Sequence, residues 1–427
     1  MIINIKVTNE DEFVPNNQDI AVNFADDSSF SFTFWNNKNK TLEWYSSQAI
    51  DLLYISLAVF AADRLVPRSD AVDGWSRTID LYIPVLEISK WVLNCELLEK
   101  MVGFLSGDYW KFHFRKREFT SREIKHKSKI EKSKKTAKTY DRVCMFSGGL
   151  DSFVGITDIL ENGAKNNLFI SLYGGGKGTK EYQGLLKEKF IEKYKLEARD
   201  FHQYYAKVVS GIEDTTRTRS FMFFAHAITV ASSLGKPVDL IIPENGLISL
   251  NIPSTSSRLG SSSTRTTHPY YLKLFQELIN NLEIPVTLKN PYQFYTKGEM
   301  LINCKNKEFL ENNLSNTMSC SHPDNGRMLG EKHARHCGYC LPCVIRQAAI
   351  KKSHLQDDSS YRDSGFVSGE TAKMSLNSYK LGIEKFNRKY AFMTIQKSGP
   401  ITENIDRFMQ LYIRGMDEVR EYLEGIE

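Results

Sequence analysis

A short glycine-rich segment in the middle of the chain combines residue types that can hold an anion. It consists of Ser147-Gly148-Gly149-Leu150-Asp151-Ser152, after an apolar run at residues 143–146 and before a helical pattern. Adjacent glycines allow positive φ angles and a close backbone approach to a ligand. The helix start adds free N–H groups and a partial positive charge, and the serines add hydroxyl donors. These features predict a cradle for a pyrophosphate group.

The loop differs from the two common nucleotide-binding motifs, because the chain contains no G-x-x-x-x-G-K-[ST] and the loop does not fit G-x-G-x-x-G. Ser-Gly-Gly-x-Asp-Ser after a strand resembles the PP-loop ATP pyrophosphatases, which cleave ATP between its α and β phosphates. The resemblance implies that residues 147–152 bind ATP and that Ser147, Asp151 and Ser152 are catalytic. It also implies Mg²⁺ near Asp151, and this ion is usually held by few protein ligands and by phosphate oxygens.

Four of the seven cysteines lie close together in the sequence. Cys320 is separated by 16 residues from Cys337-Gly-Tyr-Cys340-Leu-Pro-Cys343. An odd number of cysteines, four of them crowded, fits a disulfide framework poorly. Four thiolates can complete a tetrahedral structural zinc site that has no open position for catalysis. We therefore predict a zinc knuckle at these four cysteines, with a redox pair or a sulfur-transfer thiol as the alternative.

The loop and the cysteine cluster together resemble the QueC family of 7-cyano-7-deazaguanine synthases, over about residues 143–350. In that family, ATP adenylates the carboxylate of 7-carboxy-7-deazaguanine, ammonia displaces AMP, and a second ATP-driven step dehydrates the amide to a nitrile. The resemblance implies a substrate contact for Arg219, at a helix start. Glu244 and Asn245 follow the strand pattern 238–242, on the binding rim of an open sheet, and can recognise a guanine-like edge. A helix cap is the alternative for this pair.

Other features depart from the QueC pattern or extend it. Residues 251–268 form an insertion rich in Ser, Thr and Arg, which predicts a lid or anion-binding loop. Its predicted substrate contacts are Arg258, Arg265 and His268, and Lys297, at a later helix start, is predicted to be catalytic, as in many PP-loop enzymes. Solvated surface positions are the alternative for all four residues.

A long segment precedes the loop, whereas QueC enzymes begin almost at it. With the insertion, this segment makes the chain similar to the QueC-like proteins of bacterial anti-phage loci, the QatC type. That resemblance implies a protein partner, for which the N-terminal segment is the expected docking site. The resemblance to QueC enzymes implies a homodimer, unless the added segment replaces that contact.

Two parts of the chain, which differ in composition, must position these residues. All five tryptophans lie before residue 111, among short β-branched and aromatic runs and two helical patterns, which predicts an α+β domain. Later, apolar runs alternate with helical patterns, which predicts an α/β fold with a Rossmann-like (HUP/PP-loop) parallel sheet and helices on both faces. The predicted parts are an N-terminal domain at 1–112, a basic linker at 113–141, a PP-loop ATP-binding domain at 142–318, a zinc knuckle at 319–360 and a helical segment at 361–427.

The net charge of +5 is concentrated in one segment. Residues 112–142 contain twelve Lys or Arg and four Asp or Glu, a balance of +8, so the rest of the chain sums to −3. This segment has little apolar content, and we interpret it as a flexible linker rather than a nucleic-acid patch. Nucleic acid is therefore not an expected substrate.

Two further features indicate where the protein acts. The chain has no run of about 18 apolar residues, the length needed to cross a membrane. Its first residues lack the apolar core of a secretory signal. We expect a cytoplasmic protein with no membrane association.

Taken together, the sequence predicts an ATP-dependent, AMP-forming ligase that uses ATP, Mg²⁺ and Zn²⁺. The predicted substrate is a carboxylate of the 7-carboxy-7-deazaguanine type, and the acceptor is an amine, either ammonia or an amine of a partner protein. The alternatives are a 7-cyano-7-deazaguanine synthase with an added domain and a catalytically silent nucleotide-binding subunit. Sulfur transfer to tRNA is a third alternative, and it requires a reactive cysteine.

Overall fold

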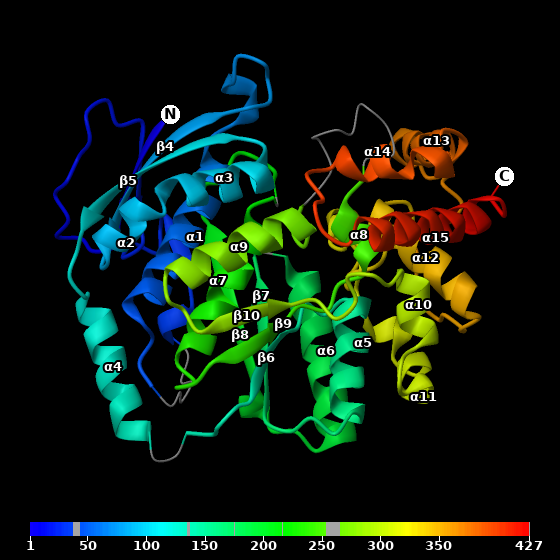
Figure 1. Cartoon of the computed structure of the whole chain (residues 1–427), viewed down its shortest axis with the longest axis horizontal. Coiled ribbons are helices and arrows are strands. Elements are labelled where there is room, and N and C mark those ends of the chain that lie inside the picture. Colours follow the sequence, from blue (N-terminus) through cyan, green and yellow to red (C-terminus); the bar gives the residue numbers. More distant parts are fainter. Residues whose placement is uncertain (37–42, 135–136, 175, 216, 253–264, 427) are drawn as a thin grey trace.

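Two β-sheets form the frame of the molecule (Figure 1). The smaller sheet has the strand order β2-β1-β4-β5 and the larger one the order β10-β9-β6-β7-β8-β3. The computed structural model describes residues 1–36, 43–134, 137–174, 176–215, 217–252 and 265–426.

The smaller sheet is built by the first part of the chain, and its strands pair in parallel. Helix α1 (Ser47–Leu65) is apolar around most of its circumference, as expected for a helix covered on all sides. It packs between strand β4 and helix α7 (Arg219–Ser232) of the second half. The other elements of this part are β1 (Ile2–Lys6), β2 (Ile20–Asn23), β4 (Thr78–Val85), β5 (Tyr109–Lys116), α2 (Ile88–Leu93) and α3 (Cys95–Ser106).

The larger sheet confirms the predicted fold class. Five of its strands are parallel, and in chain order they follow the 3-2-1-4-5 arrangement of a Rossmann-like sheet, with the direction of winding reversing between β6 and β9. Ligands of such sheets bind at the carboxyl ends of the strands beside this reversal. These strands are β6 (Arg142–Met145), β7 (Asn167–Tyr173), β8 (Phe201–Val208), β9 (Val238–Ile241) and β10 (Val286–Lys289).

Helices cover both faces of this sheet (Figure 1). Along β6, Val143 and Met145 join one apolar cluster, shared with α7 and α9, while Cys144 joins a second, shared with α5 and α6. This alternation is the side-chain period of a strand buried on both faces. The helices around the sheet are α5 (Leu150–Glu161), α6 (Lys177–Tyr194), α8 (Gly246–Leu250), α9 (Pro269–Asn281), α10 (Lys297–Ile302) and α11 (Lys307–Glu311).

The two sheets share one hydrophobic core, which runs from β1 and α1 through α7 to β10. In addition, β3 (Phe30–Phe32) from the N-terminal part pairs antiparallel with β8 and extends the larger sheet. The first 112 residues therefore contribute to both sheets. The apolar packing is continuous across the domain limits predicted from the sequence, so the packing does not separate the predicted domains. These limits stay predictions.

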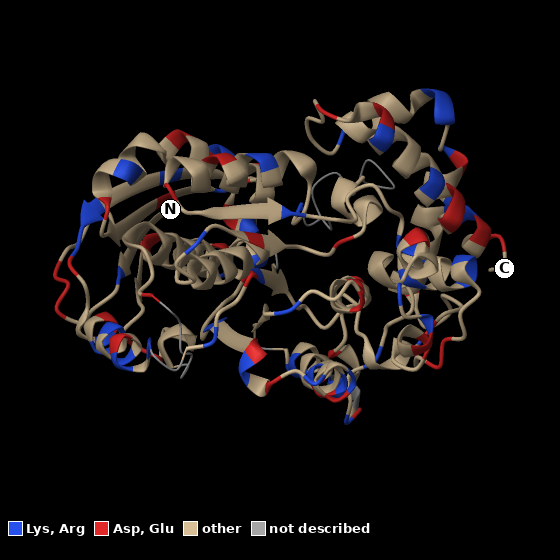
Figure 2. Ribbon diagram, turned by 60° about the horizontal axis from the view of Figure 1, so that its bottom comes forward, with Lys and Arg blue, Asp and Glu red and all other residues tan. Residues whose placement is uncertain are grey.

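The basic segment contains a helix, α4 (Ser121–Ser133), which begins with a capping box between Thr120 and Glu123. His126 and Ile130 are buried on the same helix face. The His126 ring contacts Trp35, at 5.5 Å between ring centroids. The segment is therefore not an unstructured linker. Aromatic side chains of the N-terminal part pack against one face of α4. Figure 2 shows Lys and Arg interspersed with Asp and Glu over both halves of the molecule.

The last part of the chain is helical and packs beside α8 and α10 (Figure 1). Its long final helix α15 (Ile405–Leu423) buries an apolar stripe against α12 and α14. Among the described residues, no helix combines the length and apolar character needed to cross a membrane. The remaining elements are α12 (Leu341–Ser353), α13 (Glu370–Glu384), α14 (Ala391–Gln396) and the 3-10 turns η1 (Phe34–Asn36), η2 (Arg68–Asp70), η4 (Ala198–Asp200), η6 (Leu314–Asn316), η7 (Asn325–Leu329) and η8 (Arg388–Tyr390).

Candidate functional site

The glycine loop lies at the carboxyl end of β6, where the winding of the sheet reverses. Gly148 adopts a φ of +84°, and a Cβ atom at this position would lie 3.1 Å from the side chain of Gln183. Gln183 donates a hydrogen bond to the carbonyl of Ser147 at 3.2 Å, and Met318 N donates to the carbonyl of Gly148 at 2.9 Å. The turn is therefore held from two sides, and its shape requires glycine.

The N–H groups of the loop point at serine hydroxyls. Gly149 N donates to Ser147 Oγ at 3.2 Å, and Leu150 N donates to Ser319 Oγ at 3.4 Å. Ser152 Oγ lies 3.1 Å from Ser147 Oγ and donates to the carbonyl of Gly149 at 2.9 Å. The two N–H bonds are longer than the usual 2.9–3.0 Å, so a phosphate oxygen, which accepts more strongly, can replace them. Ser319 has no motif that would identify it from the sequence.

Asp151, in the first turn of α5, is 6% exposed and is held by two residues distant in the sequence. Lys297 Nζ lies 2.6 Å from Asp151 Oδ1. Asn245 donates to Asp151 Oδ2 from its backbone N at 3.0 Å and from its side-chain Nδ2 at 2.7 Å. Burial alone would raise the pKa of Asp151, but the Lys297 cation and these hydrogen bonds lower it to about 2. Asp151 is therefore ionised at neutral pH.

Glu244 lies beside this carboxylate. Burial, the charge of Asp151 and a hydrogen bond with Asp151 raise the pKa of Glu244 well above its usual range. A carboxylic acid and a carboxylate in contact retain a proton between them, as like charges at short distance disfavour double ionisation. The site thus combines a negative Asp151, a cationic Lys297 and a protonated Glu244, which can serve as a proton donor.

The structure changes the interpretation of Asn245. Its Oδ1 accepts from Ile248 N at 3.0 Å, so the residue is the N-cap of α8, while its Nδ2 binds Asp151. Asn245 is also fully buried. The helix cap considered from the sequence is therefore its observed role, and Asn245 positions Asp151 instead of presenting its amide to a nucleobase.

Arg219 is exposed at the start of α7, on the rim of a large cleft. This helix start is held from the N-terminal part of the chain. Thr218, the N-cap residue, donates to Asp63 Oδ2 of α1 from its hydroxyl at 2.7 Å and from its backbone N at 3.3 Å. Arg219 thus has a fixed backbone, and among the described residues its guanidinium has no hydrogen bond or ion pair, so it is available for a substrate contact.

The other predicted contacts of the insertion are not brought to the loop. Arg265 donates to the carbonyl of Phe104 at 2.7 Å and stacks on its ring. His268 is fully buried and caps α9, with its two ring nitrogens at Tyr270 N and Ser398 Oγ. Burial and the Arg265 charge lower the pKa of His268 to about 3. Both residues therefore have structural partners, and Arg258 lies outside the described residues.

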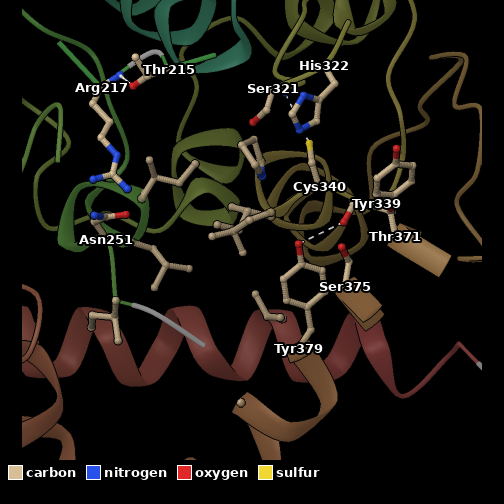
Figure 3. A pocket seen from close by; sticks show the side chains of 18 of the residues that line it. Thr215, Arg217, Asn251, Ser321, His322, Tyr339, Cys340, Thr371, Ser375 and Tyr379 are labelled. Carbon is tan, nitrogen blue, oxygen red and sulfur yellow. Dashed lines mark hydrogen bonds between the residues drawn. The ribbon is translucent and has the colours of Figure 1, made fainter. Parts of the chain in front are cut away.

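The cleft has a volume of about 1020 Å³ and lies between the two halves and the C-terminal helices. Figure 3 shows Arg217 toward one end, and Cys340 with Tyr379 toward the other. The Tyr379 hydroxyl donates to the carbonyl of Tyr339 at 3.1 Å and thereby joins α13 to the knuckle. Leu247 of α8, the helix that Asn245 caps, also lines the cleft, whereas residues 147–152 and Lys297 do not. The sequence contained no signal for the residues from α13.

The four predicted zinc ligands come together. Their sulfur atoms all lie within 4.8 Å of one another, and two pairs, Cys337–Cys343 and Cys340–Cys320, are 4.0 Å apart. Zn–S bonds of about 2.3 Å in a tetrahedron place sulfurs about 3.8 Å apart. The four cysteines thus form a metal-binding cluster whose spacing fits zinc.

Polar groups around the cluster also fit a bound cation. Backbone N–H groups of His322 and Cys337 donate to the sulfur of Cys320, each at 3.2 Å, and Cys340 N donates to Cys337 at 3.3 Å. Such bonds stabilise thiolates and orient them toward a metal. Because all four ligand positions are sulfur, the site is suited to a structural role.

The order of the strands, with the loop at the reversal of winding, defines a Rossmann-like α/β protein of the PP-loop kind. No protein-family model matches the chain. The chain is similar to 7-cyano-7-deazaguanine synthase of Rickettsia felis, with 25% identity over 242 residues that cover 51% of this chain and 98% of that protein. The corresponding synthases of Rickettsia bellii and Rickettsia akari are each 24% identical and also cover 51% of the chain. These relatives support a QueC-like family and indicate an enzyme.

Proposed function

We propose that the protein is an ATP-dependent, AMP-forming enzyme that adenylates a carboxylate of the 7-carboxy-7-deazaguanine type and transfers the acyl group to an amine. The observation that carries the proposal is the ionised Asp151 between Lys297 and Asn245, beside a glycine loop whose N–H groups are only weakly occupied. A similar relative's name, 7-cyano-7-deazaguanine synthase, supports the substrate class.

The proposed chemistry follows from the poor reactivity of a carboxylate toward amines. Its oxygen becomes a good leaving group once it attacks the α-phosphorus of ATP and pyrophosphate departs. The loop N–H groups and the hydroxyls of Ser147 and Ser152 bind the phosphate oxygens, and Lys297 compensates the charge that develops on pyrophosphate. The amine then attacks the acyl carbon and AMP leaves.

Lys297, Glu244 and two N–H groups of Asn245 occupy the roughly four acceptor positions of the Asp151 carboxylate. A Mg²⁺ ion would therefore be held mainly by the ATP phosphates, whose charge it would neutralise when bound, and Asp151 could serve as a ligand only in place of one of these donors. Glu244, with its raised pKa, holds a proton at the same site. Because this proton is shared with Asp151, we propose that a carboxyl oxygen of Glu244 accepts from the N–H groups of a guanine-like edge.

We further propose that the amine belongs to a protein partner in an anti-phage system, bound by the N-terminal part of the chain. The cleft is larger than a single deazapurine needs, and Arg68 and Trp75 of the N-terminal part line it together with Arg219. These residues leave room for a polypeptide segment beside the acyl substrate. A homodimer is proposed as well, unless the N-terminal part replaces that contact.

A second candidate is nitrile synthesis, the activity for which the relatives are named. Purified protein with zinc, ATP, Mg²⁺ and 7-carboxy-7-deazaguanine is incubated with ammonia, or with peptides that have a free N-terminal amine, and the products are identified by mass spectrometry. The proposal predicts AMP, pyrophosphate and an amide-linked product. A nitrile from ammonia without any peptide adduct would favour the second candidate. A catalytically silent subunit predicts neither AMP nor pyrophosphate, and an Asp151→Asn variant indistinguishable from the wild type.

A further inference from the structure

The C-terminal helix α15 reaches the Asp151 site through one buried acid. We propose that Glu418 is a positioning residue that fixes the start of α10 and thereby directs Lys297 at Asp151. The inference rests on the proposed function for its catalytic consequence. Helix α15 lies outside residues 143–350, the part that carries the QueC resemblance, so this role was not implied by it.

Glu418 contacts the residues on both sides of Lys297. Its Oε1 accepts from the hydroxyl of Thr296 at 2.5 Å, and its Oε2 accepts from the N–H of Gly298 at 3.3 Å. Thr296 is the N-cap of α10, and Lys297 is the first residue of this helix. One carboxylate therefore holds the two residues that flank the lysine, which leaves little freedom in the direction of its side chain.

The contact between Glu418 and the start of α10 leaves space only for a glycine at position 298. A Cβ atom on Gly298 would lie 2.7 Å from Oε1 of Glu418, closer than such atoms approach each other. A larger residue would push Glu418 away from the helix start. The absence of a side chain at position 298 is therefore what permits the contact, which explains the sequence Lys297-Gly298.

A second contact from α15 strengthens the first. Arg414, one helical turn before Glu418, lies with its Nε 2.6 Å from Glu299 and donates to the carbonyl of Phe294 at 3.0 Å. Glu299 in turn closes the capping box with Thr296. Two residues of α15 thus hold the first turn of α10 from one side.

Burial makes this contact sensitive to charge. Glu418 is 7% exposed, and burial raises its pKa to about 7, against the lowering effect of the bonds from Thr296 and Gly298. The charged groups that face it are Glu299, which raises the pKa further, and Lys352, which lowers it. An apolar residue would fill the same space, but the two donors of the α10 start would then lose their acceptor.

The test compares Glu418→Gln, which keeps the shape and replaces one acceptor oxygen with a donor, with Glu424→Gln as the matched control. Glu424 is an exposed acid at the C-cap of the same helix. Pyrophosphate release is followed with ATP, Mg²⁺ and 7-carboxy-7-deazaguanine. We expect kcat of the Glu418 variant to fall about tenfold to hundredfold, the usual effect of a small displacement of a catalytic group, with KM for ATP within about twofold. The wild-type pH profile should contain a limb near pH 7 that the variant lacks.

A second measurement does not depend on activity. Hydrogen exchange of the α10 amides and acetylation of Lys297 are measured by mass spectrometry in both variants without ligands. The proposal predicts faster exchange at the α10 start and greater labelling of Lys297 in Glu418→Gln, and neither change in the control. Unchanged exchange and labelling would overturn the proposal, as would an increase spread over all peptides, which indicates general destabilisation. A wild type that releases no pyrophosphate would count against the proposed function, while these two measurements still decide the role of Glu418.

Discussion

The ion pair between Lys297 and Asp151 can be tested by replacing the lysine with methionine, which keeps most of its volume and removes the charge. Asp151 is 6% exposed and Lys297 3%, so solvent cannot compensate for the loss. The lowering of the Asp151 pKa from 3.8 to about 2 corresponds to about 2 kcal/mol of net stabilisation. Breaking a buried ion pair by removing one partner typically costs about 3–5 kcal/mol. We therefore expect a loss of unfolding free energy between about 2 and 5 kcal/mol at pH 7.5.

The pH dependence gives a sharper signature. In the wild type, the pKa of Asp151 is lowered, so its stabilisation is present above pH 3.8 and is lost as the pH falls toward 2. Burial is already the largest single influence on this pKa, and without the opposing charge of Lys297 we expect it to raise the pKa of Asp151 above its usual range. The variant should then become relatively more stable as the pH falls from 7.5 to 5, where the carboxyl takes up a proton.

Urea unfolding at pH 7.5 and pH 5, combined with pyrophosphate release, measures both effects. Lys289→Met is the control, because Lys289 is a 53% exposed partner of Asp239 and its loss should change stability by no more than about 1 kcal/mol. Pyrophosphate release should fall about 10²–10³-fold in Lys297→Met, as expected when one stabilising group is removed from a transition state. A Lys297 variant as stable as the control at both pH values would refute the buried ion pair as described.

Three further predictions follow from local geometry. Gly148→Ala should lose about 1–2 kcal/mol from its positive φ and additional stability from the contact with Gln183, whereas Gly163→Ala has the same kind of φ and open space and should show only the first effect in urea unfolding. Thr218→Val removes the hydroxyl bond to Asp63 and should raise KM for the acyl substrate severalfold with little change in kcat, measured by steady-state kinetics. The native protein should contain one zinc per chain by elemental mass spectrometry, and Cys337→Ser should lose both the metal and several degrees of Tm, whereas a reactive-thiol role predicts an unchanged Tm.

The sequence predicted features that depend on residues close together in the chain. The glycine loop needs only a strand, two glycines and a helix start, and the metal-binding cluster needs a fixed spacing of cysteines. The alternating apolar runs predicted the parallel sheet for the same reason, since each strand carries its own pattern. These predictions of fold class and cysteine grouping are confirmed by the strand order and the sulfur distances.

Features that depend on distant contacts were not predictable in this way. His268 and Arg265 have the residue types of an anion site, but the packing of α9 against Phe104 gives them structural partners. The helix in the basic segment forms because tryptophans distant in the sequence cover His126. Glu418 lies in the helical segment predicted at 361–427, for which the sequence indicated no chemistry, and its contact with the α10 start becomes visible only when α15 is placed.

The most direct test of the proposed chemistry is the fate of the substrate carboxylate oxygen. 7-Carboxy-7-deazaguanine labelled with oxygen-18 in its carboxylate is incubated with the protein, ATP, Mg²⁺ and an amine, and the nucleotide product is examined by mass spectrometry. Adenylation of the carboxylate followed by attack of the amine predicts AMP that carries a single oxygen-18 atom. Unlabelled AMP, or ADP and phosphate in its place, would contradict the proposal that this site activates a carboxylate as its adenylate.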